Sequence, residues 1–312
     1  MKKLVFLLIA ISTVGYTLAQ QLPNVSYFMY DHARTNPGSL GSKDMICASL
    51  ILKRSYIDFG EGAPSNEFLN AEVPFKLFGA KHGVGISAFT DKIGFYNDVD
   101  VKLGYAFRFN VAEGTLGIGI SGGVRQKTLD ASKWQYGANG DELDPNIPQG
   151  TQENIFGFGF GAGLFYRSED IYLGASVSNI YPSDIEYDES TAIEDMQPHY
   201  YITAGYTFQL ANPAFEVEPA VLIFSDNLIS TTFDLNATLT YNKKIWGGVS
   251  YRAGSAVAAM AGLMILDGLK VGLAYDYPTS ALSNGSFEVL LNYCFSVGGE
   301  KSPQRYRSIR YL

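Results

Sequence analysis

The stretch Ile229-Ser-Thr-Thr-Phe-Asp-Leu-Asn-Ala-Thr-Leu-Thr-Tyr241 decides the fold, because its side chains alternate between two kinds. One set is mostly apolar and comprises Ile229, Thr231, Phe233, Leu235, Ala237, Leu239 and Tyr241. The other set is polar and comprises Ser230, Thr232, Asp234, Asn236, Thr238 and Thr240. Successive side chains of a β-strand point to opposite faces, so this segment predicts a strand with one apolar and one polar face.

Similar stretches of roughly ten residues recur from about residue 45 to about residue 296. We expect about fourteen strands, an even number as in bacterial barrels. They fall near 45–58, 66–77, 83–90, 95–109, 114–129, 154–167, 170–181, 199–210, 214–224, 229–241, 244–253, 256–266, 268–277 and 285–296. The pattern predicts an all-β fold, a transmembrane antiparallel β-barrel with lipid outside and polar groups inside. A soluble β-sandwich is the alternative, and it would bury its apolar faces.

The N-terminus has the pattern of a secretory signal peptide. Lys2 and Lys3 precede the apolar run 4–11, and small residues precede an expected cleavage after Ala19. The run is too short to cross about 30 Å of hydrocarbon as a helix. No cysteine stands at the cleavage site, which argues against a lipoprotein. We divide the chain into a signal peptide (1–19), an N-terminal periplasmic or lumen segment (20–44), the barrel (45–296) and a basic periplasmic tail (297–312).

The connections predict the orientation of the barrel. Those after even-numbered strands are short, for example 79–81 and 242–243, whereas those near 130–153 and 182–198 are long. Outer-membrane barrels place short turns in the periplasm and long loops outside. We therefore predict an outer-membrane protein with both termini in the periplasm. A sandwich offers no reason for this pattern.

Composition agrees with a membrane barrel. Aromatic residues make up 14% of the chain, with 21 Tyr and 20 Phe, whereas charged residues make up 17%. Aromatic girdles at the two membrane interfaces would use such residues. The net charge of −8 argues against nucleic-acid binding.

Two expected strands, 116–123 and 156–163, place glycine at inward positions. Inward glycines remove bulk from the lumen wall and permit sharp curvature. We favour bending of the barrel as their role over packing of another segment, such as the N-terminal one, against this wall. No strand-to-helix turn follows them, so they do not form nucleotide-binding loops.

No residue pattern predicts catalysis, a metal site or a cofactor. The histidines His32, His82 and His199 are isolated, and metal binding requires ligands at defined spacing. No nucleophile elbow is present in the sequence. Carboxylates cluster in the loop near 182–198 and in 141–146; calcium ligation is conceivable there, but we interpret both as solvated acidic loops.

The two cysteines predict a disulfide bond across the closing seam. Cys47 begins the first strand and Cys294 ends the last, and closure of a barrel pairs these strands. Alternation points both side chains into the lumen, near the rim facing the oxidising periplasm. The bond requires Cα atoms within about 7 Å, a separation that the shear of the barrel could prevent.

Several motifs give the chain a resemblance to a known family. Phe28-Met29 is followed by Asn36-Pro37 and Gly41, and the strand from Gly83 runs into Asp91-Lys-Ile-Gly94. Near the end come Tyr275-Asp-Tyr-Pro-Thr-Ser280, Asn284-Gly-Ser-Phe-Glu288, Tyr293-Cys-Phe295, Ser302-Pro303 and Arg305. With these motifs the chain resembles the PorP/SprF family of outer-membrane proteins, which belongs to the type IX secretion and gliding motility machinery of Bacteroidota.

The chain also departs from the family pattern. The early Arg-x-x-Trp is Arg54-Ser-Tyr-Ile57, Asn-Pro-Ala is Asn36-Pro-Gly38, Asp31 replaces a common Asn, and Phe287 replaces a histidine before Glu288. These departures weaken the transfer of roles to individual residues.

The resemblance implies a non-enzymatic docking component for protein secretion. Its partners would be the periplasmic ring and its lipoproteins, a large secreted adhesin, or both. Candidate partner-binding residues are Phe28, Met29, Tyr30, Asn36, Pro37, Pro303 and Arg305. The competing class is a porin or ligand-specific channel, because the inward positions carry charges of both signs at Lys102, Arg108, Arg125, Asp234, Arg252 and Glu288. Those charges would equally suit a lumen closed by ion pairs.

Overall fold

The computed structural model describes residues 24–130, 152–181, 184–186, 193–279 and 285–296. Fourteen strands form the barrel. Their bounds are β1 (Ile46–Ser55), β2 (Ser65–Leu77), β3 (Ala80–Ile93), β4 (Tyr96–Val111), β5 (Gly114–Asp130), β6 (Gln152–Arg167), β7 (Ile171–Ser178), β10 (His199–Tyr206), β12 (Phe215–Asp226), β13 (Ser230–Tyr241), β14 (Ile245–Arg252), β15 (Ala256–Leu266), β16 (Leu269–Pro278) and β17 (Ser286–Phe295).

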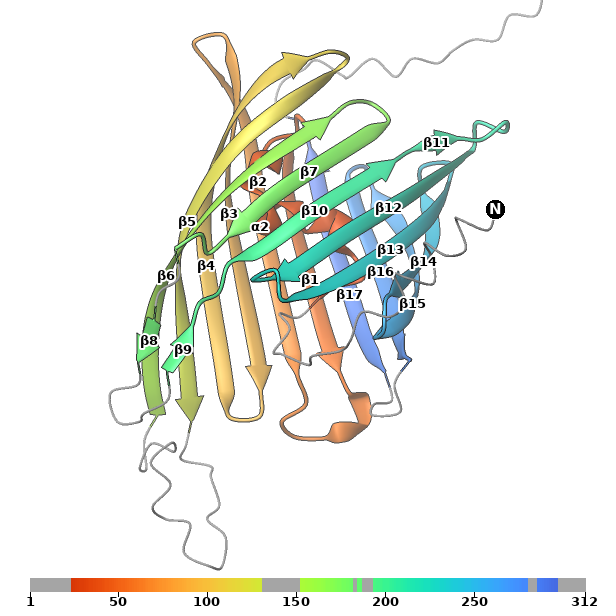
Figure 1. The fold of residues 1–312 in the computed structure, drawn as a ribbon. Coiled ribbons are helices and arrows are strands. Elements are labelled where there is room, and N and C mark those ends of the chain that lie inside the picture. The colour runs from red at the N-terminus through yellow and green to blue at the C-terminus, as the bar shows by residue number, and fades with distance from the viewer. Residues whose placement is uncertain (1–23, 131–151, 182–183, 187–192, 280–284, 297–312) are drawn as a thin grey trace, which may run out of the picture.

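Each barrel strand pairs antiparallel with its neighbours, and the sheet closes on itself where β1 pairs with β17 (Figure 1). The predicted fold class is therefore confirmed. Two short strands, β8 (Asp184–Glu186) and β9 (Ile193–Asp195), form a separate hairpin. The two-residue strand β11 (Phe208–Gln209) pairs with β12 just after β10 ends.

The pattern of burial is inverted relative to a soluble protein. In β13, Phe233 and Leu235 are 41% and 52% exposed, whereas Asp234 and Asn236 are 2% and 5% exposed. Apolar side chains therefore cover the outer wall and polar side chains line the interior, as a barrel in lipid requires. A soluble sandwich would show the opposite pattern, and this alternative is wrong.

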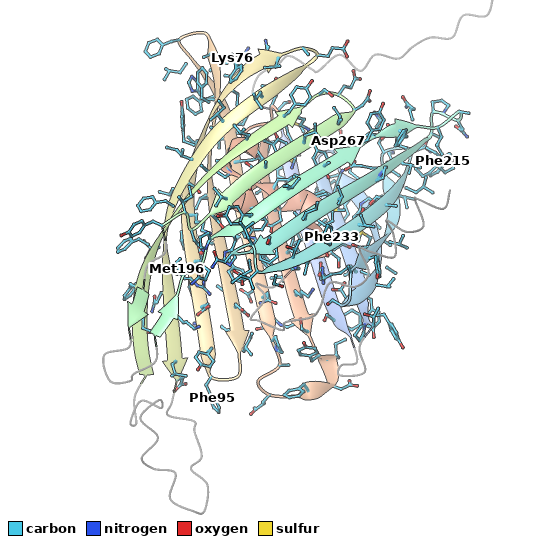
Figure 2. All side chains as sticks on the ribbon, viewed as in Figure 1. Lys76, Phe95, Met196, Phe215, Phe233 and Asp267 are labelled. Atoms are coloured by element: carbon cyan, nitrogen blue, oxygen red, sulfur yellow. A yellow bond between two sulfur atoms is a disulfide. The ribbon has the colours of Figure 1, made fainter. Side chains whose placement is uncertain are left out.

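The two rims differ in their connections. At one rim the strands join through short connections, such as 78–79 between β2 and β3 and 242–244 between β13 and β14. At the other rim lie the longer connections, including the one between β5 and β6. Lys76 lies at the short-turn rim and Phe95 at the opposite rim (Figure 2). Within the described residues, no helix is long and apolar enough to cross a membrane.

The wall has unequal height around the barrel. Strands β3 to β6 are 14 to 17 residues long, whereas β7 and β10 have 8 residues each. Strand β6 pairs with β7 over Ala162–Arg167 alone, so the remainder of β6 extends past the end of β7. Figure 1 shows β5 and β6 continuing to the long-loop end while β10 and the β12–β13 turn stop near mid-height.

Candidate functional site

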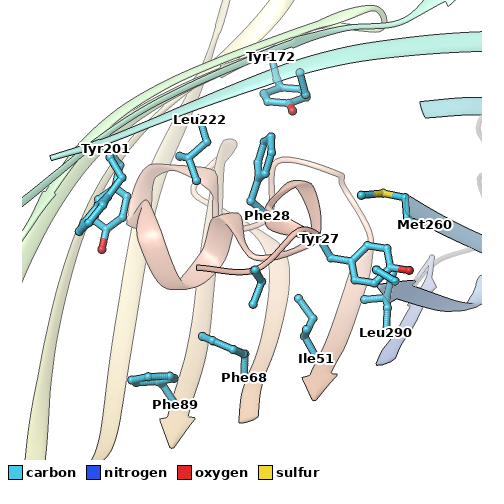
Figure 3. Packing of buried hydrophobic residues seen from close by; sticks show 14 of the residues in the cluster. Tyr27, Phe28, Ile51, Phe68, Phe89, Tyr172, Tyr201, Leu222, Met260 and Leu290 are labelled. Atoms are coloured by element: carbon cyan, nitrogen blue, oxygen red, sulfur yellow. The ribbon is translucent and has the colours of Figure 1, made fainter. Parts of the chain in front are cut away.

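The N-terminal segment, residues 24–45, lies inside the barrel and is called the plug below. It contains three single-turn helices, η1 (Phe28–Tyr30), α2 (His32–Thr35) and η2 (Pro37–Ser39); a further 3-10 turn, η3 (Ile57–Phe59), lies outside it, between β1 and β2. Tyr27 and Phe28 are buried among inward side chains of the wall (Figure 3). The Tyr27 ring meets the Trp246 ring edge-on, with centroids 5.7 Å apart. The apolar core of this protein is therefore the lumen itself.

Glycines of the wall form the seat of the plug. A Cβ atom added at Gly117 would collide with the backbone of Gly38, and one at Gly83 would collide with the backbone of Leu40. Gly163 lies against the side chain of Asn36 in the same way. Gly83, Gly117, Gly119 and Gly163 therefore give the plug room to approach the wall, whereas Gly159 and Gly161 lie against Asn179 and Ser121, outside the plug. For Gly117, Gly119 and Gly163, the contacts show packing against the N-terminal segment, and the preference for barrel bending is wrong at these positions.

Asn36 joins two strands of the wall through its side chain. Its Nδ2 group donates to the Leu164 carbonyl on β6 at 2.9 Å and to the Ala175 carbonyl on β7 at 3.4 Å. Leu164 and Ala175 are register partners. The Asn36 Oδ1 atom accepts from the Gly38 amide at 2.9 Å, which begins η2. One amide side chain thus shapes the plug and bridges β6 and β7.

A buried charged cluster binds the start of the plug. Lys53 Nζ lies 2.9 Å from both Asp276 Oδ2 and Glu288 Oε1, and it donates to the Asn24 carbonyl at 2.7 Å. The Ser26 amide donates to both Glu288 oxygens at 2.9 Å, and the Ser26 hydroxyl donates to Asp276 at 2.7 Å. Two carboxylates and one ammonium of the wall therefore bind the backbone and side chain of the plug.

Further ion pairs continue across the lumen. Arg252 Nε lies 3.0 Å from Asp234 Oδ1, and Arg108 Nη1 lies 3.0 Å from Asp44 Oδ1. Arg125 pairs with Asp98. The mixed charges that suggested a water-filled pore are thus largely paired with each other or with the plug. Alternation could place Lys53 and Asp276 inside, but nothing local in the sequence indicated that both face Ser26.

Small cavities lie between the plug and the wall, and a larger one lies at the short-turn rim. Three cavities between plug and wall hold about 10, 20 and 10 Å³. A larger cavity of about 520 Å³ opens at the short-turn rim. Its lining carries charges of both signs, from Lys43, Asp44, Lys81, Glu113, Arg167 and Glu169.

The closing seam carries both cysteines. Cys47 and Cys294 are register partners in the β1–β17 pair, with Cα atoms 4.1 Å apart, and their Sγ atoms lie 2.10 Å apart. Lys53 and Glu288 are register partners further along the same seam. The shear of the barrel therefore leaves these inward pairs aligned.

The proposed partner-binding residues lie in two places. Phe28, Asn36 and Pro37 are buried in the lumen, and Met29 and Tyr30 pack beside the same apolar cluster. Pro303 and Arg305 lie outside the described residues, as do the signal peptide and most of both acidic loops. Among the residues that the structure describes, no group of three or more His, Cys, Asp or Glu side chains could hold a metal ion.

A closed fourteen-stranded antiparallel barrel with an apolar outer wall and an ion-paired lumen defines the class of outer-membrane β-barrel proteins. Within this class the chain belongs to the PorP/SprF family, because the family described as "Type IX secretion system membrane protein PorP/SprF" matches residues 17–293. No curated protein matches.

Solved structures show the same kind of barrel. The chain is similar to the "CymD monoaromatic hydrocarbon channel", with 13% identity, 86% of this chain and 93% of that chain covered, and a TM-score of 0.52. It is also similar to the toluene transporter TbuX of Ralstonia pickettii, with 10% identity, 86% and 94% coverage, and a TM-score of 0.50. At these identities the likeness shows the fold alone.

Proposed function

We propose that this protein is a closed, non-enzymatic base in the outer membrane that docks secreted cargo or a surface adhesin, the periplasmic ring complex, or both, for type IX secretion. The observation that carries the proposal is the seated plug. A general pore requires a continuous aqueous path, and the plug leaves cavities of about 10 and 20 Å³ between itself and the wall.

Orientation is part of the proposal. Short turns usually face the periplasm and longer loops face outward. In this orientation the cavity of about 520 Å³ opens toward the periplasm, where a ring component would meet the ionic lining. The plug runs from Asn24, beside Lys53, to Asp44 at the short-turn rim. Its first described residue therefore lies in the outer half of the lumen.

Ionic conductance in planar bilayers tests whether the barrel is closed. We expect the wild-type protein to be silent. Gly117→Val should produce open channels, because its side chain would collide with the backbone of Gly38 and unseat the plug. Gly122→Val is the matched control on the same strand, since its Cβ would make ordinary contact with the Phe160 ring at 3.6 Å. A stable open channel from the wild type would favour the porin alternative instead.

Purification from the native outer membrane tests the docking role. A tagged full-length protein, extracted in mild detergent after cross-linking, should bring with it secretion components or one large surface protein. Reproducible recovery of the barrel alone would contradict docking. A hydrolase activity has no support in the described residues.

A further inference from the structure

Within the described residues, one edge of β6 has no paired strand beside the shortened part of the wall. Pairing with β7 ends at Ala162, which faces Val177. Beyond that point, the described residues supply one backbone hydrogen bond to this edge, from the Ile180 amide to the Phe160 carbonyl at 2.9 Å. The N–H and C=O groups of a strand residue point to the same side, and this side alternates along the strand. Phe158 and Phe156 therefore direct their backbone groups toward the free edge, like Phe160, whereas Gly157 and Gly159 direct theirs toward β5.

The free edge lies at the depth of the membrane. The outward side chains Phe156, Phe158, Phe160 and Leu164 are apolar and between 49% and 62% exposed, whereas the next outward residue, Asn154, is polar. An apolar band about 25 Å tall surrounds such barrels. Unpaired sheet edges do not persist against lipid, because hydrocarbon offers no hydrogen-bond partner. The edge at Phe156 and Phe158 therefore requires a partner that supplies backbone donors and acceptors.

The wall behind this edge is closed, so it is not a lateral pore. A Cβ atom at Gly159 would lie 2.7 Å from Asn179 Oδ1 and 3.5 Å from Met196 Cε. Met196 is 3% exposed and Asn179 is equally buried. The β8–β9 hairpin lies close to β6, but its backbone pairing is within itself (Figure 1). This edge of β6 is thus a row of backbone N–H and C=O groups, not an opening for small molecules.

We propose that residues 154–160 of β6 accept an extended strand of a second polypeptide, which adds to the barrel wall at the long-loop end. The occupant is a β-strand because only another strand presents donors and acceptors at the spacing of this edge. Its outward side chains would be apolar, matching lipid and the three phenylalanines. Its inward side chains would cover the glycines, as large residues do across from glycine in paired strands. The inference rests on the proposed function in that the strand belongs to a secreted or surface partner.

Proline at position 158 tests the edge without requiring the partner. Phe158→Pro removes an amide that this structure leaves unpaired, and proline is tolerated at such edge positions. We expect the heat stability of Phe158→Pro to equal that of Phe158→Ala. The gel shift of the folded barrel measures this stability. Gly157→Pro, the matched control, removes a donor directed at β5 and should lower the stability. Equal destabilisation by Phe158→Pro and Gly157→Pro would mean that the chain already pairs this edge, which overturns the proposal.

Recovery of partners tests the strand addition itself. Full-length wild type, Phe158→Ala and Phe158→Pro are purified from the native outer membrane, and co-purifying secreted proteins are quantified. Phe158→Ala should retain them, and Phe158→Pro should lower recovery by about tenfold or more, since a blocked donor interrupts the new ladder at its centre. Equal recovery with all three proteins would refute strand addition and leave the docking function standing. No recovery with any of them would count against both.

Discussion

Two seams of this barrel, β1–β17 and β6–β7, are stabilised by different contacts. The closing seam between β1 and β17 is paired over ten residues, Ile46–Ser55, and carries Cys47–Cys294 and Lys53–Glu288 as inward cross-strand pairs. The seam between β6 and β7 is paired over six residues and carries neither. There the plug supplies the connection, through the amide of Asn36 and the ring of His32. The first seam thus has cross-strand pairs of the wall itself in addition to its plug contacts, whereas the side-chain links across the second come from the plug.

This difference bears on function. The proposed docking role requires a fixed base, which the closing seam would provide. It also needs a place where a partner can be admitted, and the β6–β7 seam has fewer backbone bonds to separate. Local stability in proteins varies in this way, and binding elements are drawn from its lower end. The plug contacts both seams, Ser26 binding Glu288 at the first and Asn36 binding Leu164 at the second.

The largest effect is expected from breaking the closing seam at Lys53. Lys53→Met leaves Glu288 buried without its ammonium partner, while Asp276 keeps Arg252 Nη1 at 3.7 Å, and removing one partner of a buried pair costs about 3–5 kcal/mol. Arg54→Met is the matched control, because its ion pair with Glu67 is half-exposed and worth about 0–1 kcal/mol. Urea unfolding of the protein in lipid measures both. Equal losses would show that the cluster is hydrated and not structural.

The cysteine pair should contribute next. We predict that the purified protein contains a Cys47–Cys294 disulfide and that Cys47→Ser with Cys294→Ser lowers the free energy of unfolding by about 2–4 kcal/mol. Reductant should lower the free energy of unfolding of the wild type toward that of the double variant. It should leave the value of the double variant unchanged. Thiol labelling of the denatured protein provides the direct check. Equal labelling with and without reductant would remove the disulfide from this account.

Breaking the second seam should cost less. Asn36→Ala removes hydrogen bonds to the partly buried carbonyls of Leu164 and Ala175, for a loss of about 1–3 kcal/mol. Asn110→Ala, at an exposed position of β4, should be close to neutral. Trypsin cleavage after Arg34 should also accelerate if the plug is released. Unchanged cleavage together with unchanged stability would show that Asn36 does not hold this seam.

The strands and the closing seam could be predicted from the sequence, whereas the plug contacts could not. The alternation of apolar and polar residues places strands such as 256–266 at the bounds that the structure shows. Closure of the sheet then brings Cys47 opposite Cys294. The plug has no such signal, because its single-turn helices follow neither a period of 2 nor one of 3.6. Its contacts also join residues far apart, as with Ser26 and Glu288, which lie 262 positions apart.

The early end of β7 was also beyond sequence reasoning. Residues 170–181 continue an apolar pattern, and the predicted strand therefore ran to Tyr181, whereas β7 ends at Ser178. Where a strand stops depends on tertiary contacts, here Asn179 with its side chain at the carbonyl of Gln197 and the ring of His199. A hydrophobicity pattern identifies the face of a strand but not the residue at which its neighbour departs.

The smallest effect is expected from protonating His32, which separates the two seams by pH. Its ring packs on Phe165 of β6 and Tyr172 of β7, with centroids 5.3 and 4.9 Å away. Burial, with the charges of Lys43 and Arg167, lowers the pKa of His32 well below its usual 6.5. The folded protein therefore holds His32 neutral, so this contribution is complete above about pH 6.5 and is lost below it, by about 1.4 kcal/mol per pH unit. His32→Gln, with His82 and His199 left in place, should remove this contribution to the slope. Plug release in the wild type should rise between pH 6.5 and 5.5.

Lys53→Met is the control, because Lys53 and its carboxylates lie at the other seam. It should leave the His32-dependent slope in place. A slope that disappears in Lys53→Met would show that the two seams are coupled.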